Sequence, residues 1–261
     1  MVKFTVITCT YNASKEVERT LESVLSQTYP HVEHLIVDGL SKDDTLLKAD
    51  VYAQKSREMG SSHEVWIVSE RDKGLYDAMN KGIRMAKGDY VIFMNAGDKF
   101  HDADTLSDVA KQLEQNCLGG NTDRQLPGVI YGDTDIVDDS GTFLHKRRLS
   151  PPERLTWKSF RNGMLVCHQS FYARADIAKR TPYNLEYRFS ADVDWCIRVM
   201  RDAQGRGLSL YNTHLTLTSY LEGGMSIKNH RASLIERFHV MRRHYGIIIT
   251  VLKHVSFLFR Q

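Results

Sequence analysis

Acidic side chains follow the apolar segments of the first hundred residues, where they could bind a cation and a phosphorylated ligand. Asp98 follows the apolar run 90–94 after a short polar turn. Such runs predict buried strands, and open α/β sheets bind ligands beyond the carboxyl ends of their strands. A carboxylate at that edge suits a divalent cation that holds a diphosphate. We therefore take Asp98 as a candidate ligand of such a cation.

A second polar group predicts contacts to a nucleotide. Thr8, Tyr11 and Asn12 stand at the end of the first predicted strand. Asp38 and Gly39 end the next strand, and parallel strands bring both groups to one edge of the sheet. The carboxylate could accept the imide N–H of uracil or a ribose hydroxyl, and glycine allows close backbone approach. Taken alone, the pattern is also typical of an acidic turn.

Two carboxylates, Asp192 and Asp194, open a predicted helix in the second half. The apolar residues Trp195, Val199 and Met200 share one face of this helix. A helix N-terminus stabilises carboxylates. By itself, the pair is therefore typical of ordinary helix capping.

Strand and helix patterns alternate in the first hundred residues. Apolar and β-branched runs predict strands over 4–9, 34–38, 64–68 and 90–94, and helices over 17–25 and 75–86. This alternation predicts an α/β fold with a doubly wound, mostly parallel sheet flanked by helices.

The second half has a less regular pattern. We expect a helix, a polar loop, a meander of short strands and two further helices, in that order. Their predicted ranges are 104–115, 117–127, 129–131, 135–137, 143–145, 194–203 and 233–245.

Charge is unevenly distributed along the 261 residues. Residues 228–261 contain seven Lys and Arg against a single acid, Glu236, whereas the rest of the chain contains 28 basic and 31 acidic residues. A mildly acidic body argues against a nucleic-acid partner but permits contact of the tail with an anionic membrane. The cysteines form no C-x-x-C pair and no signal peptide is evident, so we expect a cytoplasmic protein.

The basic tail, 227–261, is also rich in apolar residues. Its longest apolar stretch, 247–259, is interrupted by charge and too short to span a bilayer. Two interpretations remain open. The tail either forms a helix packed on the body, or docks in the headgroup region on the inner face of the plasma membrane.

Four segments occur together and in order, and as a set they resemble the inverting GT-A enzymes of glycosyltransferase family 2. They are 8–12, 38–45, 70–82 and 86–98. The sequence looks similar to the bacterial exopolysaccharide and colanic-acid-type branch of that family. The resemblance implies a GT-A-like domain over 1–226, with a nucleotide-binding half at about 1–100 and an acceptor half at about 101–226. Residues 227–261 would form a helical, basic and amphipathic appendage.

The resemblance assigns roles to the nucleotide-binding positions. Asp38 matches the family's nucleobase-binding aspartate. The first nucleotide-contacting loop is matched by Thr8, Tyr11 and Asn12. The segment that approaches the base and the phosphates is matched by Arg71, Asp72 and Lys73.

The resemblance also implies a divalent cation, Mn²⁺ or Mg²⁺. Residues 95–98 stand where many relatives have an Asp-x-Asp-Asp cluster, but here the first and third positions are Asn95 and Gly97. Asp98 would carry the ion, Asn95 would contribute its neutral carbonyl, and diphosphate oxygens and waters would complete the shell. Because two carboxylates are replaced, we expect weak binding by the free protein.

Asp192 matches the family residue that supplies the catalytic base, which inversion needs to deprotonate the acceptor hydroxyl. Four other positions are candidate contacts to donor or acceptor sugar: Asp133, His168, Gln169 and Asp194. For three of them a structural interpretation stays open. Asp133 could belong to a β-turn, His168 could be a hydrogen-bonded core residue, and Asp194 could support the helix.

The resemblance implies transfer of a hexose or N-acetylhexosamine, with inversion, from a UDP-sugar to a hydroxyl of a glycan or lipid-linked glycan. The process would be bacterial surface-polysaccharide assembly, and a GDP- or dTDP-sugar donor stays open. A sugar nucleotidyltransferase is a second hypothesis, but such enzymes usually have a Gly-rich basic loop that residues 10–14 do not supply. A non-catalytic nucleotide-sugar sensor or scaffold is a third, motivated by the reduced acidic cluster.

Overall fold

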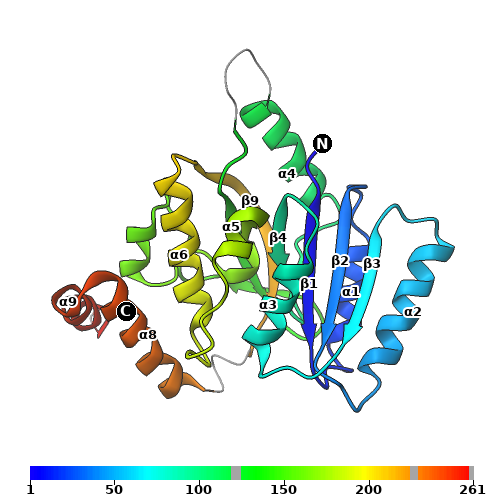
Figure 1. The fold of residues 1–261 in the computed structure, drawn as a ribbon, viewed down its shortest axis with the longest axis horizontal. Helices are drawn as coiled ribbons and strands as arrows, with labels where there is room; N and C mark the ends of the chain where they lie inside the picture. The colour runs from blue at the N-terminus through cyan, green and yellow to red at the C-terminus, as the bar shows by residue number, and fades with distance from the viewer. Residues whose placement is uncertain (119–124, 224–228, 259–261) are drawn as a thin grey trace.

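The computed structural model describes residues 1–118, 125–223 and 229–258, which form a nine-stranded sheet flanked by helices (Figure 1). The strand order is β3-β2-β1-β4-β8-β6-β9-β5, with β7 paired to β6. The strands are β1 (Phe4–Thr10), β2 (Val32–Asp38), β3 (Glu64–Ser69), β4 (Tyr90–Phe93), β5 (Lys99–Phe100), β6 (Val129–Val137), β7 (Phe143–Lys146), β8 (Phe171–Arg174) and β9 (Leu210–Leu221).

The helices cover both halves of this sheet. They are α1 (Val17–Leu25), α2 (Thr45–Glu58), α3 (Leu75–Met85), α4 (Thr105–Leu113), α5 (Ala175–Arg180), α6 (Ala191–Gly205), α8 (His230–Tyr245) and α9 (Ile247–Leu258). Short helical segments are η1 (Glu114–Leu118), η2 (Trp157–Asn162) and η3 (His168–Ser170).

Parallel strands form the first half of the sheet, as the sequence predicts. β1 and β2 are buried along their whole length, which explains their continuous apolar and β-branched runs. Helix α3 packs closely on β1 at Gly82, where a Cβ atom would come within 2.5 Å of Ile7 Cγ2. Since β1, β2, β3 and β4 are parallel, the loops that follow them reach the same edge of the sheet.

The second half of the sheet is mixed. β8 is antiparallel to both β4 and β6, whereas β6 and β9 are parallel. The predicted meander is wrong, because 129–131 and 135–137 belong to the single strand β6. The register of β6 against β9 shifts beside Gly132, where the two strands approach so closely that a Cβ atom would lie 2.5 Å from the Leu215 carbonyl oxygen. The expected strand at 143–145 is β7.

The predicted helices of the second half correspond to α4, α6 and α8. Helix α6 is fixed in the core by Trp195, whose ring stacks on Tyr183 at 4.8 Å between centroids and meets Phe93 edge-on at 5.6 Å. The expected polar loop at 117–127 and the expected domain boundary at 226/227 lie partly or wholly outside the described residues.

Helices α8 and α9 lie together beside α6 and η2 (Figure 1). Val240, Met241 and Tyr245 of α8 are buried in the main hydrophobic core. The described part of the tail therefore forms helices packed on the body, but α9 leaves apolar residues such as Ile248 and Leu252 exposed, so this packing does not exclude contact with a membrane. Within residues 1–118, 125–223 and 229–258, no helix has both the length and the apolar character needed to cross a bilayer.

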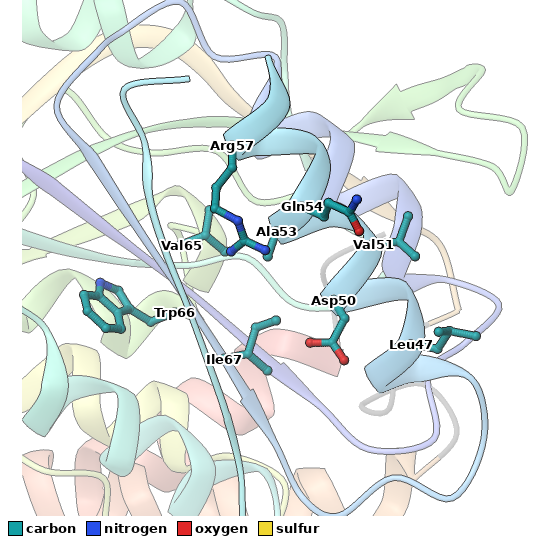
Figure 2. A pocket seen from close by; sticks show the side chains of 9 residues that line it. All are labelled: Leu47, Asp50, Val51, Ala53, Gln54, Arg57, Val65, Trp66 and Ile67. Carbon is teal, nitrogen blue, oxygen red and sulfur yellow. The ribbon is translucent and has the colours of Figure 1, made fainter. Parts of the chain in front are cut away.

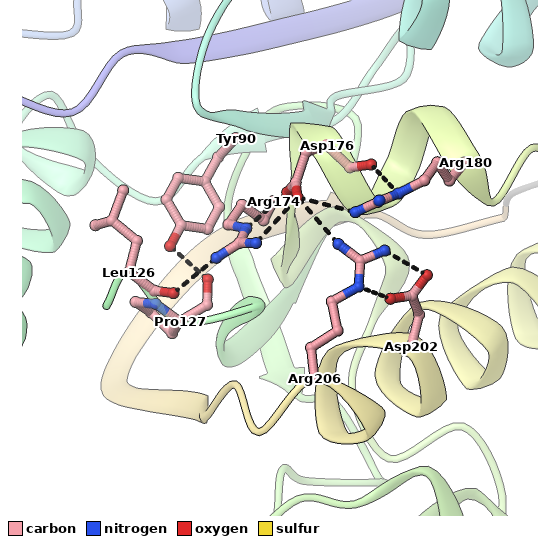
Figure 3. A network of polar contacts seen from close by, with 8 residues as sticks. All are labelled: Tyr90, Leu126, Pro127, Arg174, Asp176, Arg180, Asp202 and Arg206. Carbon is pink, nitrogen blue, oxygen red and sulfur yellow. Dashed lines mark hydrogen bonds and ion pairs between the residues drawn. The ribbon is translucent and has the colours of Figure 1, made fainter. Parts of the chain in front are cut away.

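An ionic network joins β8, α5 and α6 (Figure 3). Asp176 accepts hydrogen bonds from the guanidinium groups of Arg174, Arg180 and Arg206, and Arg206 also pairs with Asp202. Arg174 is paired in register with Tyr90, the first residue of β4. The network therefore lies at the amino end of β4, opposite the edge where the candidate site residues gather.

Candidate active site

Asp38 lies at the carboxyl end of β2 and is fully buried. Its Oδ1 accepts hydrogen bonds from the hydroxyls of Thr10 and Ser41. Its Oδ2 accepts bonds from Ser41 N at 2.9 Å and from Ser69 Oγ at 2.8 Å. These four donors use the four lone-pair positions of a carboxylate. Asp38 thus ties the ends of β1, β2 and β3 together, and a nucleobase N–H reaches it only if one donor turns away.

Tyr11, Gly39 and Asp72 converge at the same edge. A Cβ atom at Gly39 would lie 2.5 Å from Asp72 Oδ2 and 3.3 Å from Tyr11 Cδ2. The ring of Tyr11 is 63% exposed, so it offers an aromatic face to a ligand. Asn12 links the first two loops, because its N–H donates to Ser41 Oγ and its Oδ1 accepts from Lys42 N. The structure therefore brings Tyr11, Asn12, Asp38 and Asp72 together.

Arg71 and Lys73 flank Asp72 just before helix α3 and are exposed. Asp72 Oδ1 accepts a hydrogen bond from Gly74 N at 2.8 Å, which orders the turn into the helix. Two cationic side chains before a helix N-terminus form an environment that favours an anionic ligand. This geometry suits the predicted contact with the diphosphate.

Thr8 has a different environment from the other predicted nucleotide contacts. It is fully buried, and its Oγ1 lies 2.9 Å from His34 Nε2. Since side chains two apart on a strand share a face, Thr8 lies one repeat below Thr10, and Thr10 rather than Thr8 reaches Asp38. The contacts of Thr8 support the sheet beneath the loops.

Asp98 is buried behind the end of β4 and is bonded to Gln169. Gln169 Nε2 donates to Asp98 Oδ2 at 2.7 Å, and Leu221 N donates to Oδ1 at 3.0 Å. Burial raises the pKa of Asp98 to about 7, although both hydrogen bonds and the charge of Arg19 act in the opposite direction. The candidate metal ligand and the candidate sugar contact Gln169 are therefore direct neighbours.

The residues around Asp98 fit a cation that is held mainly by its substrate. No cluster of three His, Cys, Asp or Glu side chains that could hold a metal occurs among the described residues. However, Asn95 Oδ1 is buried without a hydrogen-bond partner in the turn that contains Asp98. Mg²⁺-type sites commonly use one or two carboxylates and complete their shell with phosphates and water. The unpartnered oxygen of Asn95 fits such a site. The Asp98 carboxylate is 4% exposed and each of its oxygens already accepts a hydrogen bond, so a cation reaches it only if Gln169 or the Leu221 segment moves.

Asp192 is the second residue of α6 and is only partly buried. The hydroxyl of Tyr76 on α3 donates to Asp192 Oδ1 at 3.3 Å. Burial, together with the negative charge of Asp192, raises the pKa of Tyr76 well above its ordinary value, so this phenol stays protonated as a donor. Among the described residues Asp192 therefore has one weak hydrogen-bond partner and retains accepting capacity, as a general base requires.

His168 is surrounded by aromatic rings beneath Asp192. It stacks on Phe93 at 4.9 Å between centroids, meets Trp195 edge-on, and shares a short hydrogen bond with the hydroxyl of Tyr183. Burial lowers the pKa of His168 to about 4, against the influence of Asp192. These are the contacts of a neutral core imidazole, the structural interpretation left open above.

Asp194 faces the protein interior. Arg198 Nε donates to its Oδ2 and His244 Nε2 contacts its Oδ1, both at 2.7 Å. Burial alone would raise the pKa of Asp194, but its hydrogen bonds from His244 and Arg198 lower it. With 1% exposure and both oxygens occupied, Asp194 supports α6 and does not present a carboxylate to a sugar.

Asp133 is partly buried next to the bulge in β9. Its carbonyl oxygen accepts a hydrogen bond from Ser170 Oγ, which joins β6 to η3 beside Gln169. It therefore lies in a strand rather than in a β-turn.

Tyr220 lies on β9, next to Leu221, whose N–H donates to Asp98. Burial first, and then the negative charges that include Asp98 and Asp192, raise the pKa of Tyr220 above its ordinary value. Both carboxylates thus act on the same tyrosine.

The sequence model of Glycosyl transferase family 2 matches residues 5–180. The chain belongs to glycosyl transferase family 2. This family 2 chain is 33% identical over 225 residues to a PGL/p-HBAD biosynthesis glycosyltransferase of Mycobacterium tuberculosis, covering 85% of this chain and 78% of that relative. It is 30% identical over 208 residues to the amylovoran biosynthesis glycosyltransferase AmsB of Erwinia amylovora, covering 76% and 64%.

Solved structures show the fold of this family 2 chain. TarS of S. aureus in complex with UDP-GlcNAc superposes with a TM-score of 0.69 at 19% identity, covering 96% of this chain and 66% of TarS. The mannosyltransferase PcManGT of Pyrobaculum calidifontis, in complex with GDP-Man and Mn²⁺, gives a TM-score of 0.63 at 15% identity, covering 100% and 76%. The predicted family and GT-A-like fold are confirmed.

Two surface hollows of the family 2 chain lie apart from Asp38 and Asp192. One, of about 450 Å³, lies between α2 and the edge strand β3 and is lined by residues such as Asp50, Arg57 and Trp66 (Figure 2). The other, of about 540 Å³, lies between α1, β5 and the turn before β7. Neither hollow is lined by a predicted site residue.

Sequence reasoning missed two parts of the site of this family 2 chain. Tyr76 lies in the segment 70–82, one of the four that resemble the family. The sequence pattern of that segment does not indicate a role for the Tyr76 hydroxyl. Contacts from α8 reach α6 through Glu236 and His244. The available signal was Glu236 itself, because it is the single acid within residues 228–261.

Proposed function

We propose that this family 2 chain transfers a sugar, with inversion, from a nucleotide sugar to a hydroxyl of a glycan or lipid-linked glycan. The observation that carries the proposal is Asp192, a partly exposed carboxylate at the start of α6 beside the nucleotide loops. Inversion requires one base that deprotonates the acceptor while it attacks C1 opposite the leaving nucleotide. Asp192 supplies that base, and the Tyr76 hydroxyl orients its carboxylate.

UDP is the donor nucleotide we propose, as part of a UDP-hexose or UDP-N-acetylhexosamine. Tyr11 offers a ring for stacking, and Asp38 accepts the imide N–H once a loop donor turns away. Arg71 and Lys73 neutralise the diphosphate together with the N-terminus of α3. The UDP-GlcNAc complex of TarS supports this choice, whereas the GDP-Man complex of PcManGT keeps GDP in the test.

We propose a divalent cation, Mn²⁺ or Mg²⁺, as cofactor. Asp98 and Asn95 would hold it, and the ion would stabilise negative charge on the leaving diphosphate. Gln169 orients the Asp98 carboxylate through its 2.7 Å hydrogen bond. The Mn²⁺ in the PcManGT complex supports the assignment.

The acceptor we propose belongs to bacterial surface-polysaccharide assembly at the inner face of the plasma membrane. The names of the amylovoran and PGL/p-HBAD relatives support a glycan or glycolipid product.

Helix α9 exposes Ile248, Val251, Leu252 and Val255 on one face, beside a basic α8. We expect flotation with anionic but not neutral liposomes. Equal recovery with both, or no loss after truncation at Gly246, would remove the membrane contact from the proposal.

Thermal unfolding in the presence of UDP, GDP or dTDP tests the nucleotide assignment. A ligand that binds only the folded state raises the midpoint. We expect UDP with Mn²⁺ or Mg²⁺ to give the largest increase, and EDTA to reduce it. A larger increase with GDP or dTDP would reassign the donor, and no increase with any nucleotide would favour a non-catalytic scaffold.

A further inference from the structure

Glu236, the single acid of the basic tail, is directed into the molecule. It lies on α8, and its carboxylate accepts three backbone hydrogen bonds from the segment that precedes α6. Arg188 N donates to Oε1 at 2.8 Å, and Phe189 N and Ser190 N donate to Oε2 at 2.7 and 2.9 Å. A carboxylate on backbone N–H groups is among the stronger types of protein hydrogen bond. Glu236 therefore fixes the path of the chain into α6.

Helix α6 lacks a side-chain cap of its own. Ser190 occupies the N-cap position, but its side chain makes no capping hydrogen bond. Its hydroxyl instead contacts Ser233 of α8 at 3.2 Å, to both the carbonyl and hydroxyl oxygens. A carboxylate near the positive end of a helix is stabilising. Glu236 thus supplies from α8 the anchoring that a local cap would normally give.

A second contact joins α8 to α6 at Asp194, one helical turn after Ser190. His244 of α8 meets Asp194 at 2.7 Å, and Arg198 holds the other oxygen of that carboxylate. The side chains of His244 and Asp194 are 5% and 2% exposed. Helix α8 therefore contacts the chain both just before Asp192, at residues 188–190, and just after it, at Asp194.

We infer that helix α8 positions the proposed base, with Glu236 as the positioning residue that acts through Asp192. The inference rests on the proposed function, since it assumes that Asp192 is the base. Within the part of the chain that the structure describes, Glu236 makes no hydrogen bond to Asp192 or to the nucleotide loops. It therefore acts by fixing residues 188–190 and the helix start that follows. A displacement of about 1 Å at a reacting group can lower a rate by on the order of a hundredfold.

Glu236→Gln tests the inference, with Glu186→Gln as a matched control. Glu186 also links the segment before α6 to α8, but through an exposed 3.7 Å ion pair with Arg243, which contributes little. We expect Glu236→Gln to lower kcat about 10- to 100-fold while the donor KM and the UDP-induced increase in unfolding midpoint stay within about twofold. Hydrogen exchange should accelerate at the amides of residues 188–190 and not in β1 or β2. Glu186→Gln should match the parent protein.

Two further comparisons decide between positioning and a general structural role. Combined with Asp192→Asn, Glu236→Gln should cause no additional loss of the residual rate, because both act through one carboxylate. Glu236→Asp keeps the charge on a shorter side chain and should show a smaller kcat loss, and it serves if Glu236→Gln fails to fold. Unchanged kcat in both Glu236 variants, or losses that follow only the folded fraction, would overturn the inference. Normal turnover of Asp192→Asn would instead overturn the base assignment in the proposed function.

Discussion

The loops around Asp38 and the helix start that carries Asp192 are held by different kinds of contact. The donors to Asp38 come from the ends of the neighbouring strands β1 and β3 and from the loop that follows β2 itself. The start of α6 is instead held by α8, from the tail beyond the motifs that carry the family resemblance. The nucleotide side is therefore self-supporting, whereas the catalytic side depends on a distant helix.

This difference predicts a separation of effects. Substitutions near Asp38 should weaken nucleotide binding, since that site forms from its own loops. Substitutions near Asp192 should lower turnover at unchanged nucleotide affinity. The predictions below test this separation, from the largest expected effect to the smallest.

Asp192→Asn should lower kcat about 1,000-fold, because an amide cannot accept the acceptor proton, and general base catalysis contributes roughly 10²- to 10⁴-fold. The affinity for nucleotide, measured by titration calorimetry, should stay within about twofold. Asp202→Asn is the control on the same helix, where the carboxylate only pairs with Arg206. Near-normal turnover in Asp192→Asn would remove the base assignment.

Asp38→Asn should weaken nucleotide binding by about 10- to 100-fold and leave kcat at saturating donor much less affected. The amide of Asn would point its own N–H group at hydroxyls that now donate to the carboxylate, such as those of Thr10 and Ser69. Two donors would then face each other, so the loops after β1 and β3 would separate. Asp44→Asn, an exposed position in the same loop whose side chain makes no capping hydrogen bond to α2, is the control. A loss of kcat without a loss of affinity would contradict the separation of the two sides.

Lowering the pH should destabilise both sides through buried neutral histidines. Burial lowers the pKa of His34 to about 3 and of His168 to about 4, below the ordinary value of 6.5. Between pH 6.5 and 4 the unfolded chain binds protons at these two histidines that the folded chain excludes, which lowers the free energy of unfolding as pH falls, on the order of 2 kcal/mol for each histidine. The raised pKa of Asp98 acts in the opposite direction over this range, because the folded chain keeps a proton there that the unfolded chain releases, so the net fall is smaller than the sum of the two histidine contributions. Urea unfolding across this range measures the slope, and His168→Gln should reduce it. A slope that is the same in the parent protein and in His168→Gln would contradict the burial argument.

Tyr76→Phe should lower kcat about 2- to 10-fold, because it removes one hydrogen bond to Asp192 that is worth roughly 1 kcal/mol. Tyr52→Phe is the counterpart on the nucleotide side, where the hydroxyl bonds to His34. That control should lower the unfolding midpoint but leave kcat within about twofold. Equal losses of kcat in the two variants would show that Tyr76 acts only through stability.

The parallel half of the fold could be predicted because its signals are local. The apolar runs of β1, β2 and β4 and the residues that end them are contiguous in the sequence, and the family motifs add roles to those positions. Helix α2 was missed, because its apolar residues do not form a clear helical stripe and Leu47 and Val51 remain exposed. The sequence patterns predict two strands where the structure has the single strand β6. The irregularity beside Gly132 is a bulge in the partner strand β9, so β6 itself continues through it.

The catalytic side could be predicted only in part. Asp192 was found through the resemblance, but the partner of Asp194 is His244, fifty residues further along, and no local pattern announces that contact. For the same reason Asp194 was expected at a sugar, and Glu236 was counted only as an exception in a basic tail. Contacts between distant segments depend on how the helices pack against one another. The spacing of residues along the sequence does not predict that packing.

The stereochemistry of the first product tests the central claim most directly. Proton NMR can follow a UDP-α-sugar with the full chain and Mn²⁺, in the presence of acceptor or of water alone, before the released sugar equilibrates. The account predicts that the β-configured product forms first and that Asp192→Asn forms almost none. An α-configured first product, or equal formation by Asp192→Asn, would contradict inversion by an Asp192 base.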